Sequence, residues 1–425
     1  MPDIDLARVR ADTPGCAEVT HFNNAGASLP PAIVVNTVVD YLRQESRVGG
    51  YELADQRVEE IAAVYRSVAG VVGATEDEVA LLDNATRAWD MAFYSLPFVA
   101  GDRILTTTTE YAANFIAYLQ VAEKTGAHIE VVPDDESGAV DLNALEAMID
   151  DRTKLISMNH VPTNGGLVNP AAAVGSIARD TGVPFLLDAC QSVGQMPIDV
   201  DEIGCDMLAA TSRKFLRGPR GVGFLYVRDT MIESLEPAML DLHGARWVQA
   251  DRYEVRNDAK RFETWESNPA LRLGLAAACD YALAIGLDAI WQRVASLAAI
   301  LRAALSQVSG VTVYDKGRVK GGIVTFGVAG IDASRVHEEL LQRRINTSVS
   351  SVFSTRIDME QRGLSEVVRA SVHYFNTEHE VDRLVGAVEE LAGRQSAWRP
   401  LPAPSFLGNS GAAGLPEQRF GGSTQ

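Results

Sequence analysis

Pro184-Phe-Leu-Leu-Asp-Ala-Cys-Gln191 is a short apolar run that ends in polar side chains. Its apolar part is too short for a helix and is typical of a buried parallel strand. A second run, Met207 to Ala210, ends at Thr211-Ser-Arg-Lys214. Because ligands bind beyond the carboxyl ends of parallel strands, we expect Asp188 and Lys214 to lie in one crevice.

These residue types suit one kind of cofactor chemistry. A lysine amine can form a Schiff base with a carbonyl group. A carboxylate beneath a pyridine ring keeps the ring nitrogen protonated, so that the ring accepts electrons. Asp188, Gln191 and Lys214 therefore favour a site for a carbonyl-bearing pyridine cofactor.

Asp188-Ala-Cys-Gln191 followed by Ser212-Arg-Lys214 resembles the signature of class V aminotransferases, which bind pyridoxal 5'-phosphate. That family includes the cysteine desulfurases, isopenicillin N epimerase and the C–S lyases of ergothioneine synthesis. The resemblance extends from about Asn23 to about Val385. It implies an α/β enzyme of fold type I, with a large domain built on a mainly parallel, seven-stranded type of sheet and a smaller α+β C-terminal domain.

The alternation of strands and helices independently predicts βαβ crossovers and a parallel sheet. We divide the chain into an N-terminal segment (1–30), a large cofactor-binding domain (31–280), a small domain (281–395) and a disordered tail (396–425). Pro, Gly, Ser and Ala dominate this tail. Residues 229–262 show mixed patterning and are predicted to be loop-like.

The resemblance assigns further residues to the cofactor. Ala85 and Thr86 begin a predicted helix, whose backbone amides can bind phosphate, although Thr86 could equally be a helix cap. Tyr111 stands where desulfurases carry a histidine that stacks on the pyridine ring; without the resemblance it would be interpreted as a core aromatic residue. Thr163 replaces an asparagine that reaches the ring oxygen, and Asn164 could substitute for it. The other predicted cofactor contacts are Gln191, Thr211 and Arg213.

Ser267 and Asn268 precede a predicted helix that starts near Ala270. In the family this loop crosses a dimer interface to the partner's cofactor phosphate, and a simple helix cap is an alternative of nearly equal weight. The resemblance therefore implies a homodimer with active sites at its interface.

Three regions are candidates for substrate binding. Arg369 lies in an apolar strand, where its planar fork would bind either an internal carboxylate or, as in the family, the α-carboxylate of an amino acid. Asn23 and Asn24 belong to a turn-rich segment that lines the substrate side in the family, although composition alone favours a connector. Tyr51 ends Arg47-Val-Gly-Gly-Tyr51, a pattern similar to the ergothioneine-type C–S lyases.

The positions of the cysteines reduce the number of candidate reactions. Cysteine desulfurases need a nucleophilic cysteine in the loop before the carboxylate-binding arginine, and residues 346–365 contain none. We therefore expect C–S β-elimination from an S-substituted cysteine or its sulfoxide, with Lys214 moving the α-proton. The alternatives are an aminotransferase, an epimerase or a decarboxylation-coupled deaminase. A non-catalytic binding protein is disfavoured because Asp188, Gln191, Lys214 and Arg369 occur together.

Charge and composition exclude other classes. The net charge of −18 argues against nucleic acid and anionic membrane surfaces as partners. The four cysteines have no CxxC or metal-ligand spacing, which is typical of reduced thiols in a cytoplasmic protein. We expect no bound metal, no signal peptide and no membrane span, because no apolar run approaches ~20 residues.

Overall fold

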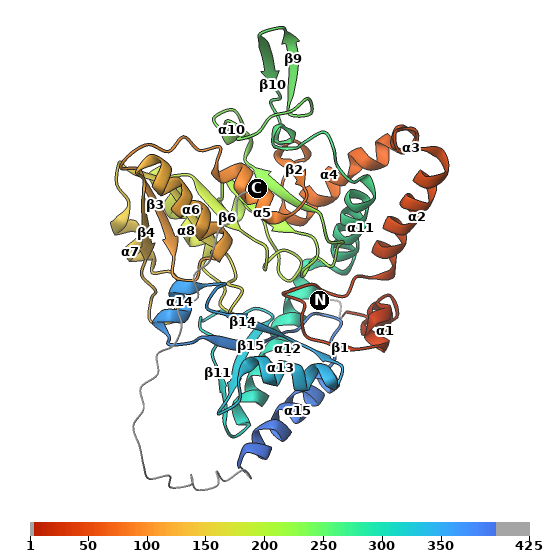
Figure 1. The fold of residues 1–425 in the computed structure, drawn as a ribbon, viewed down its shortest axis with the longest axis vertical. Helices are drawn as coiled ribbons and strands as arrows, with labels where there is room; N and C mark the ends of the chain where they lie inside the picture. Colours follow the sequence, from red (N-terminus) through yellow and green to blue (C-terminus); the bar gives the residue numbers. More distant parts are fainter. Residues whose placement is uncertain (1–3, 397–425) are drawn as a thin grey trace, which may run out of the picture.

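The computed structural model describes residues 4–396, which form two sheets with helices packed around them (Figure 1). The predicted disordered tail lies outside the described residues, apart from Ser396. The larger sheet has seven strands in the order β2-β8-β7-β6-β5-β3-β4. Its strands are β2 (Val79–Leu82), β3 (Arg103–Thr107), β4 (His128–Val132), β5 (Thr153–Asn159), β6 (Phe185–Asp188), β7 (Met207–Thr211) and β8 (Gly223–Val227).

This sheet is mainly parallel, as the sequence predicts. Strands β4, β3, β5, β6 and β7 pair in parallel, whereas β8 runs antiparallel to both of its neighbours. Every residue of β6, β7 and β8 is buried. Burial on both faces explains why these strands are continuous apolar runs without alternation.

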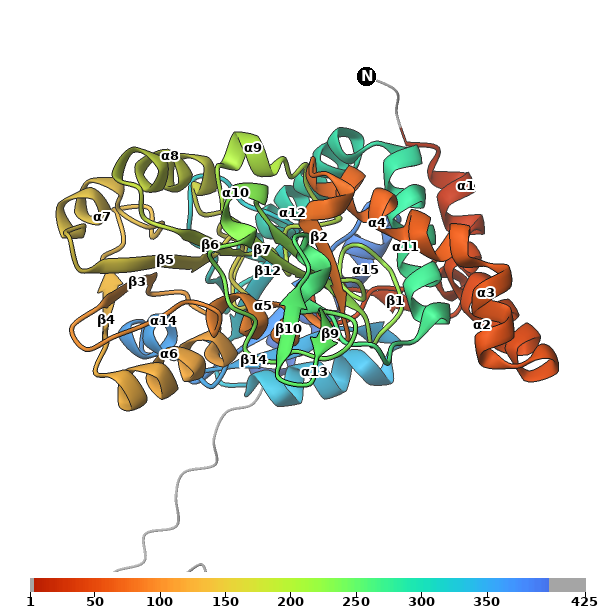
Figure 2. The ribbon, with the colours of Figure 1, turned by 90° about the horizontal axis from the view of Figure 1, so that it is seen from above.

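Helices cover both faces of this sheet (Figure 2). Leu187 packs in a core cluster with α4 (Val58–Val72), α8 (Ala171–Thr181) and α11 (Pro269–Ile285). Its neighbour Leu186 packs in a second cluster with α5 (Ala85–Phe93) and α6 (Ala112–Thr125). Successive strand residues point to opposite faces, so the two clusters lie on either side of the sheet. The remaining helices of this part are α2 (Ala32–Val48), α3 (Gly50–Gln56), α7 (Leu142–Met148), α9 (Val200–Ile203) and α10 (Asp229–Ile232).

The smaller sheet is antiparallel and has the order β11-β12-β15-β14. The strands β11 (Val311–Val313), β12 (Ile323–Val328), β14 (Ser348–Ser351) and β15 (Glu366–Ser371) form it. Its associated helices are α12 (Leu287–Gln307), α13 (Ala333–Gln342), α14 (Arg356–Gln361) and α15 (Glu378–Ser396).

The N-terminal segment joins this smaller part of the molecule. After α1 (Leu6–Ala11), strand β1 (Thr20–His21) pairs in parallel with β13 (Ile345–Asn346). The Asn24 side-chain amide then donates a 2.6 Å hydrogen bond to the Ser371 carbonyl oxygen. The N-terminal segment is therefore attached beside β15, at its last residue, Ser371.

The loop-like prediction for residues 229–262 is wrong. This region contains α10, a short 3-10 helix (Ala259–Phe262) and an antiparallel hairpin of β9 (Ala245–Gln249) and β10 (Arg252–Val255). The hairpin projects from the body at the top of Figure 1. Trp247 and Tyr253 are exposed on it, at 78% and 56%. A strand without a buried face has no apolar alternation, so its sequence lacks the usual signal.

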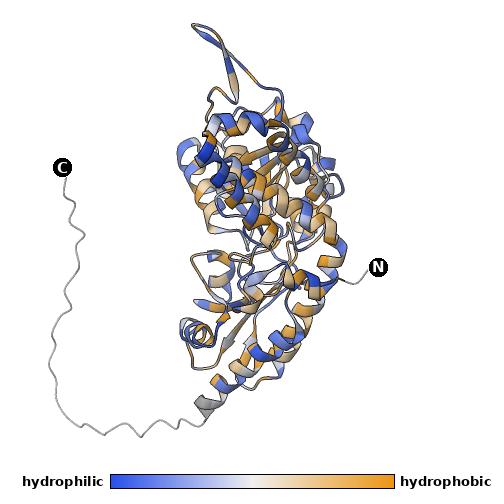
Figure 3. Cartoon of the chain, turned by 90° about the vertical axis from the view of Figure 1, so that its right-hand side faces the viewer, coloured by the Kyte–Doolittle hydropathy of each residue, from blue (hydrophilic) through white to orange (hydrophobic). Residues whose placement is uncertain are grey.

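Hydrophobic residues make up much of the strands inside the molecule, whereas hydrophilic residues recur along the outer helices (Figure 3). Within residues 4–396, no single helix is long and apolar enough to cross a membrane. Helices α11 and α12 meet that test only as a pair, by length and composition, and they are bent by 80°. Many of their apolar residues, among them Leu275 and Leu297, are buried in the core.

Candidate active site

A cavity of about 230 Å³ opens at the carboxyl ends of the central strands. It brings together every predicted cofactor residue except Ser267 and Asn268. Its lining consists of Asn84, Ala85, Thr86, Tyr111, Asn114, Asn159, Val161, Thr163, Asp188, Cys190, Gln191, Thr211, Arg213 and Lys214. The expected meeting of Asp188 and Lys214 in one crevice is confirmed.

Asp188 ends strand β6 and has two hydrogen-bond donors. The Cys190 backbone N–H donates to Oδ1 at 2.9 Å, and Asn114 Nδ2 donates to Oδ2 at 3.1 Å. Asn114 is on α6 and was given no role by the sequence. These two contacts hold the carboxylate at the cavity wall, where it could face the ring nitrogen of a bound cofactor.

Lys214 is half-buried in the turn that follows β7. Burial lowers the pKa of its amine; the nearby Cys190 and Asp188 oppose that shift, and Arg213 and Arg369 add to it. A lowered pKa increases the fraction of neutral amine, which is the nucleophilic form. The same turn packs against Gly194, whose φ is +90°, and a Cβ there would lie 2.3 Å from the Leu216 nitrogen.

Arg217 anchors this turn to the rest of the molecule. It is 1% exposed and has a φ of 65°. Its guanidinium donates to the Leu29 carbonyl oxygen at 2.9 Å and to the hydroxyls of Tyr374 and Thr13, each at 2.6 Å. One side chain therefore connects the Lys214 turn to the N-terminal segment and to the region after β15.

The helix α5 begins at the cavity wall. Its N-cap is Asn84, whose side chain accepts from the Arg87 N–H at 3.0 Å, so Thr86 is not the cap. The helix start packs closely on β8, where a Cβ at Gly223 would lie 2.9 Å from the Ala85 nitrogen. A helix N-terminus with a hydroxyl residue in its first turn is suited to a phosphate group.

Arg369 is a buried guanidinium in β15, with 8% of its surface exposed. It donates to Ser348 Oγ at 3.0 Å, to Thr163 Oγ1 at 2.6 Å and to the Thr163 carbonyl oxygen at 3.2 Å. Burial lowers the pKa of Arg369 to about 10. In the described part of the chain no carboxylate pairs with it, so the internal salt bridge is not formed.

The structure does not bring the other predicted substrate residues to the cavity. Asn24 is fully buried and accepts from Ser28 Oγ at 2.7 Å, so its contacts are those of a connector. Asn23 bridges to Ser371 and does not line the cavity. Tyr51 is 73% exposed on α3, away from the cavity. Within one chain, their roles toward a substrate have no geometric support.

Ser267 and Asn268 line a separate cavity of about 230 Å³, together with Arg87 and Arg272. Asn268 Oδ1 accepts from the Leu271 N–H at 3.1 Å and caps α11, which is the alternative that the sequence left open. A contact with a partner's phosphate stays a prediction.

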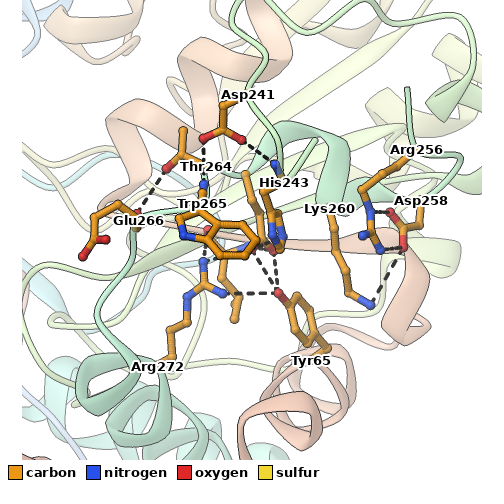
Figure 4. Close-up of polar contacts among 12 residues, drawn as sticks. Tyr65, Asp241, His243, Arg256, Asp258, Lys260, Thr264, Trp265, Glu266 and Arg272 are labelled. Carbon is orange, nitrogen blue, oxygen red and sulfur yellow. Dashed lines mark hydrogen bonds and ion pairs between the residues drawn. The ribbon is translucent and has the colours of Figure 1, made fainter. Parts of the chain in front are cut away.

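A buried polar cluster fixes the loop that precedes α11 (Figure 4). Glu263 accepts from the Leu81 N–H at 2.8 Å, from the Tyr65 hydroxyl at 2.9 Å and from Arg272 at 2.9 Å. Asp241 accepts from the Trp265 N–H at 2.7 Å. These contacts hold residues 263–265 against the body. The positions of Ser267 and Asn268, which follow them, are restricted as a result.

The residues of the first cavity fit pyridoxal 5'-phosphate. Asp188 would hold the ring nitrogen, Tyr111 offers an aromatic face, Lys214 would bond the carbonyl carbon, and the start of α5 would hold the phosphate. Gln191 Oε1 is buried without a hydrogen-bond partner, which leaves it available to a bound group. Among the described residues, no group of three or more His, Cys, Asp or Glu could hold a metal ion.

The family model for aminotransferase class-V matches residues 20–384. The chain belongs to this family. A probable cysteine desulfurase of Methanothermobacter thermautotrophicus is 31% identical over 392 residues, covering 91% of this chain and 98% of the relative. A probable cysteine desulfurase of Halobacterium salinarum is 31% identical over 405 residues, covering 91% and 96%.

A solved structure supports the same assignment. The apo cysteine desulfurase from Thermococcus onnurineus NA1 superimposes with a TM-score of 0.86 at 28% identity, covering 93% of this chain and 99% of that one. This class V enzyme therefore has the predicted fold type I architecture, and its cofactor is pyridoxal 5'-phosphate.

Proposed function

We propose that this class V enzyme catalyses C–S β-elimination from an S-substituted cysteine or its sulfoxide. The observation that carries the proposal is the buried Arg369, which contacts the cavity residue Thr163 and has no carboxylate partner in the described chain. A buried unpaired cation is costly, so an anionic ligand would stabilise it. The α-carboxylate of an amino acid provides that charge, and relatives named cysteine desulfurases favour a cysteine-type substrate.

The chain offers no thiolate nucleophile at this cavity. Cys190 is its one cysteine among the lining residues, and burial raises the pKa of that thiol far above neutrality. The segment where desulfurases carry their cysteine is held in place: the Ala112 N–H donates to the Ser354 carbonyl oxygen at 2.9 Å, and the Asp358 N–H donates to that of Thr108 at 3.1 Å. These facts disfavour persulfide formation on the protein.

The other roles follow from position. Bound pyridoxal phosphate supplies an electron sink for negative charge at the substrate α-carbon. Arg369 orients the α-carboxylate, and Lys214 removes the α-proton as a general base. Asp188 balances the positive charge of the ring nitrogen. The Cβ–S bond then breaks, and its electron pair leaves with sulfur.

We also propose that the enzyme is a cytoplasmic homodimer, and we keep the domain division near residue 280. Ser267 and Asn268 lie outside the cavity of their own chain. A position of this kind suits residues that complete the phosphate site of a second copy.

The test offers the cofactor-loaded enzyme S-substituted cysteines, their sulfoxides and free cysteine, with plain amino acids as a comparison. Pyruvate, ammonia and a thiol or sulfenate are expected in equal amounts, and Lys214→Ala should abolish them. Sulfane sulfur and alanine from cysteine would instead identify a desulfurase. An oxo acid, an aldehyde or a racemised substrate without a sulfur product would overturn β-elimination in favour of transamination, decarboxylation or epimerisation.

A further inference from the structure

Glu110 is a buried carboxylate beside the cavity, 3% exposed, in the turn between β3 and α6. Its Oε1 accepts from the Tyr111 N–H at 2.8 Å and from Asn114 Nδ2 at 2.9 Å. Its Oε2 lies 3.1 Å from Thr106 Oγ1 and 3.2 Å from the Tyr118 hydroxyl. In the described chain no lysine or arginine pairs with it. Burying an ionised carboxylate without a cation is costly, so its presence here calls for an explanation.

Asn114 connects this carboxylate to Asp188. Its Nδ2 donates to Glu110 Oε1 at 2.9 Å and to Asp188 Oδ2 at 3.1 Å. An amide nitrogen has two hydrogens, so each carboxylate receives one. Two acids from β6 and from the turn after β3 are therefore held at a fixed separation by one side chain.

Among the described residues, Asp188 is the charged group that faces Glu110. Burial, followed by the negative charge of Asp188, raises the pKa of Glu110 to about 7. Tyr118 on α6 also faces it, but burial raises the pKa of that phenol well above its ordinary value, so it stays neutral. Thr106 on β3 and Ser157 on β5 contribute hydroxyls that do not titrate near neutral pH.

We propose that Glu110 is a positioning residue that acts through Asn114. The pair holds Asp188 in place beneath the cofactor ring, and the charge of Glu110 increases the preference of the ring nitrogen for its proton. This inference rests on the proposed role of Asp188. When a protonated ring neutralises Asp188, the repulsion that hinders ionisation of Glu110 falls, so cofactor binding and loss of the Glu110 proton are coupled.

The test compares Glu110→Gln with the wild type. Glutamine is nearly isosteric: its oxygen can accept from Tyr111 and Asn114, and its NH₂ can donate to the hydroxyls of Thr106 and Tyr118. We expect cofactor affinity, titrated into the apoenzyme, to fall about tenfold, as for other supporting hydrogen-bond partners of a ligand-binding group. The pH midpoint of the bound cofactor's visible band should fall by about one unit, because a nearby negative charge is lost.

Glu123→Gln is the matched control, because Glu123 is exposed further along α6. It should change neither quantity. Asn114→Ala keeps the charge of Glu110 but breaks the connection, so it should weaken cofactor binding with a smaller shift of the midpoint. Wild-type affinity together with an unshifted midpoint in Glu110→Gln would overturn the proposal.

Two measurements keep the outcomes distinct. If Asp188→Asn leaves cofactor binding and the visible band unchanged, the proposed role of Asp188 fails. If Asp188→Asn changes cofactor binding and the band, but Glu110→Gln changes neither of them, only the inference about Glu110 fails. Should Glu110→Gln not fold, infrared difference spectra of the wild type decide. At pH 6 they should show a carboxylic acid band that disappears on adding pyridoxal phosphate, and its persistence would contradict the coupling.

Discussion

Arg369 lies between Ser348 and Thr163, which are both uncharged, and its neighbours in β15 are buried and apolar. Its five N–H donors in a rigid plane match a carboxylate better than a single ammonium group can. For binding a carboxylate, the planar geometry of the Arg369 guanidinium therefore matters as much as its charge.

Arg369→Lys separates these two properties. We expect the affinity for amino acids to fall about 10- to 100-fold, since a hydrogen bond to a charged group contributes about 1.5–3 kcal/mol. Spectral titration of the bound cofactor with an amino acid, and with the corresponding amine that lacks the carboxylate, measures this loss. The amine should be unaffected, and an equal loss for both ligands would refute carboxylate binding. Arg356→Lys, at an exposed side chain of α14, is the control.

Individual residues differ in how far the sequence can predict them. Asp188 and Lys214 were predictable because apolar runs mark where strands end, and strand ends meet at one edge of the sheet. Asn114 was not, because its partner Asp188 lies 74 positions away in the chain. For Tyr51, a local motif carried no information about distance from the cavity, and the residue is exposed on α3.

At the scale of elements, the phosphate end of the cavity depends on how closely α5 approaches β8. That approach is possible because residue 223 has no side chain: a Cβ there would lie 2.7 Å from the Ala210 carbonyl oxygen and 2.9 Å from the Ala85 nitrogen. All of these atoms belong to the backbone, so the contact cannot be relieved by a rotamer change.

Gly223→Ala should therefore displace the start of α5. We expect a loss of about 1–3 kcal/mol in the free energy of unfolding, as for other overpacked sites, and weaker binding of pyridoxal phosphate to the apoenzyme. Gly386→Ala is the matched control, because nothing lies within 4 Å of a Cβ at that position in α15. It should stabilise the protein by about 0.5–1 kcal/mol, the helix preference of Ala over Gly. Unchanged cofactor affinity in Gly223→Ala would count against this phosphate site.

Elements buried on both sides were predicted best. Strands β6 and β7 appear in the sequence as short apolar runs because every residue is buried. The β9–β10 hairpin was missed, since most of its residues are exposed and its sequence has no apolar face. Pairing of β1 with β13, across more than 300 positions, also has no local signal. The local sequence shows that a strand is buried, because its residues are apolar. It does not show which distant strand pairs with it.

At the scale of the whole molecule, three buried histidines affect its response to acid. Burial lowers the pKa of His21, lowers that of His160 to about 4, and lowers that of His373 well below its ordinary value. His373 is held neutral: its Nε2 lies 2.7 Å from the Phe215 carbonyl oxygen, and its Nδ1 accepts from the Tyr374 N–H at 3.0 Å.

These groups determine whether the free energy of unfolding rises or falls with pH. Below about pH 6.5 the unfolded chain binds protons at its histidines that the folded protein excludes, so stability falls as the pH falls. Glu110 has the opposite effect between its ordinary range and pH 7, because the folded state binds a proton that the unfolded chain has lost. The two histidines with the largest shifts, His160 and His373, together with His21, outweigh the single proton of Glu110, so stability falls as the pH falls.

The apoenzyme should therefore lose unfolding free energy as the pH falls from about 6.5 to 5, by about 1.4 kcal/mol per pH unit for each net proton that the unfolded chain gains. Urea unfolding at pH 7.5, 6.5 and 5.5 measures this slope. His160→Gln removes one of the excluded protons, so its slope should be shallower by about 1 kcal/mol per unit. His128→Gln, at an exposed position that begins β4, should keep the wild-type slope. If His160→Gln lost stability with pH as steeply as the wild type, burial of a neutral His160 would not explain the acid sensitivity of this fold.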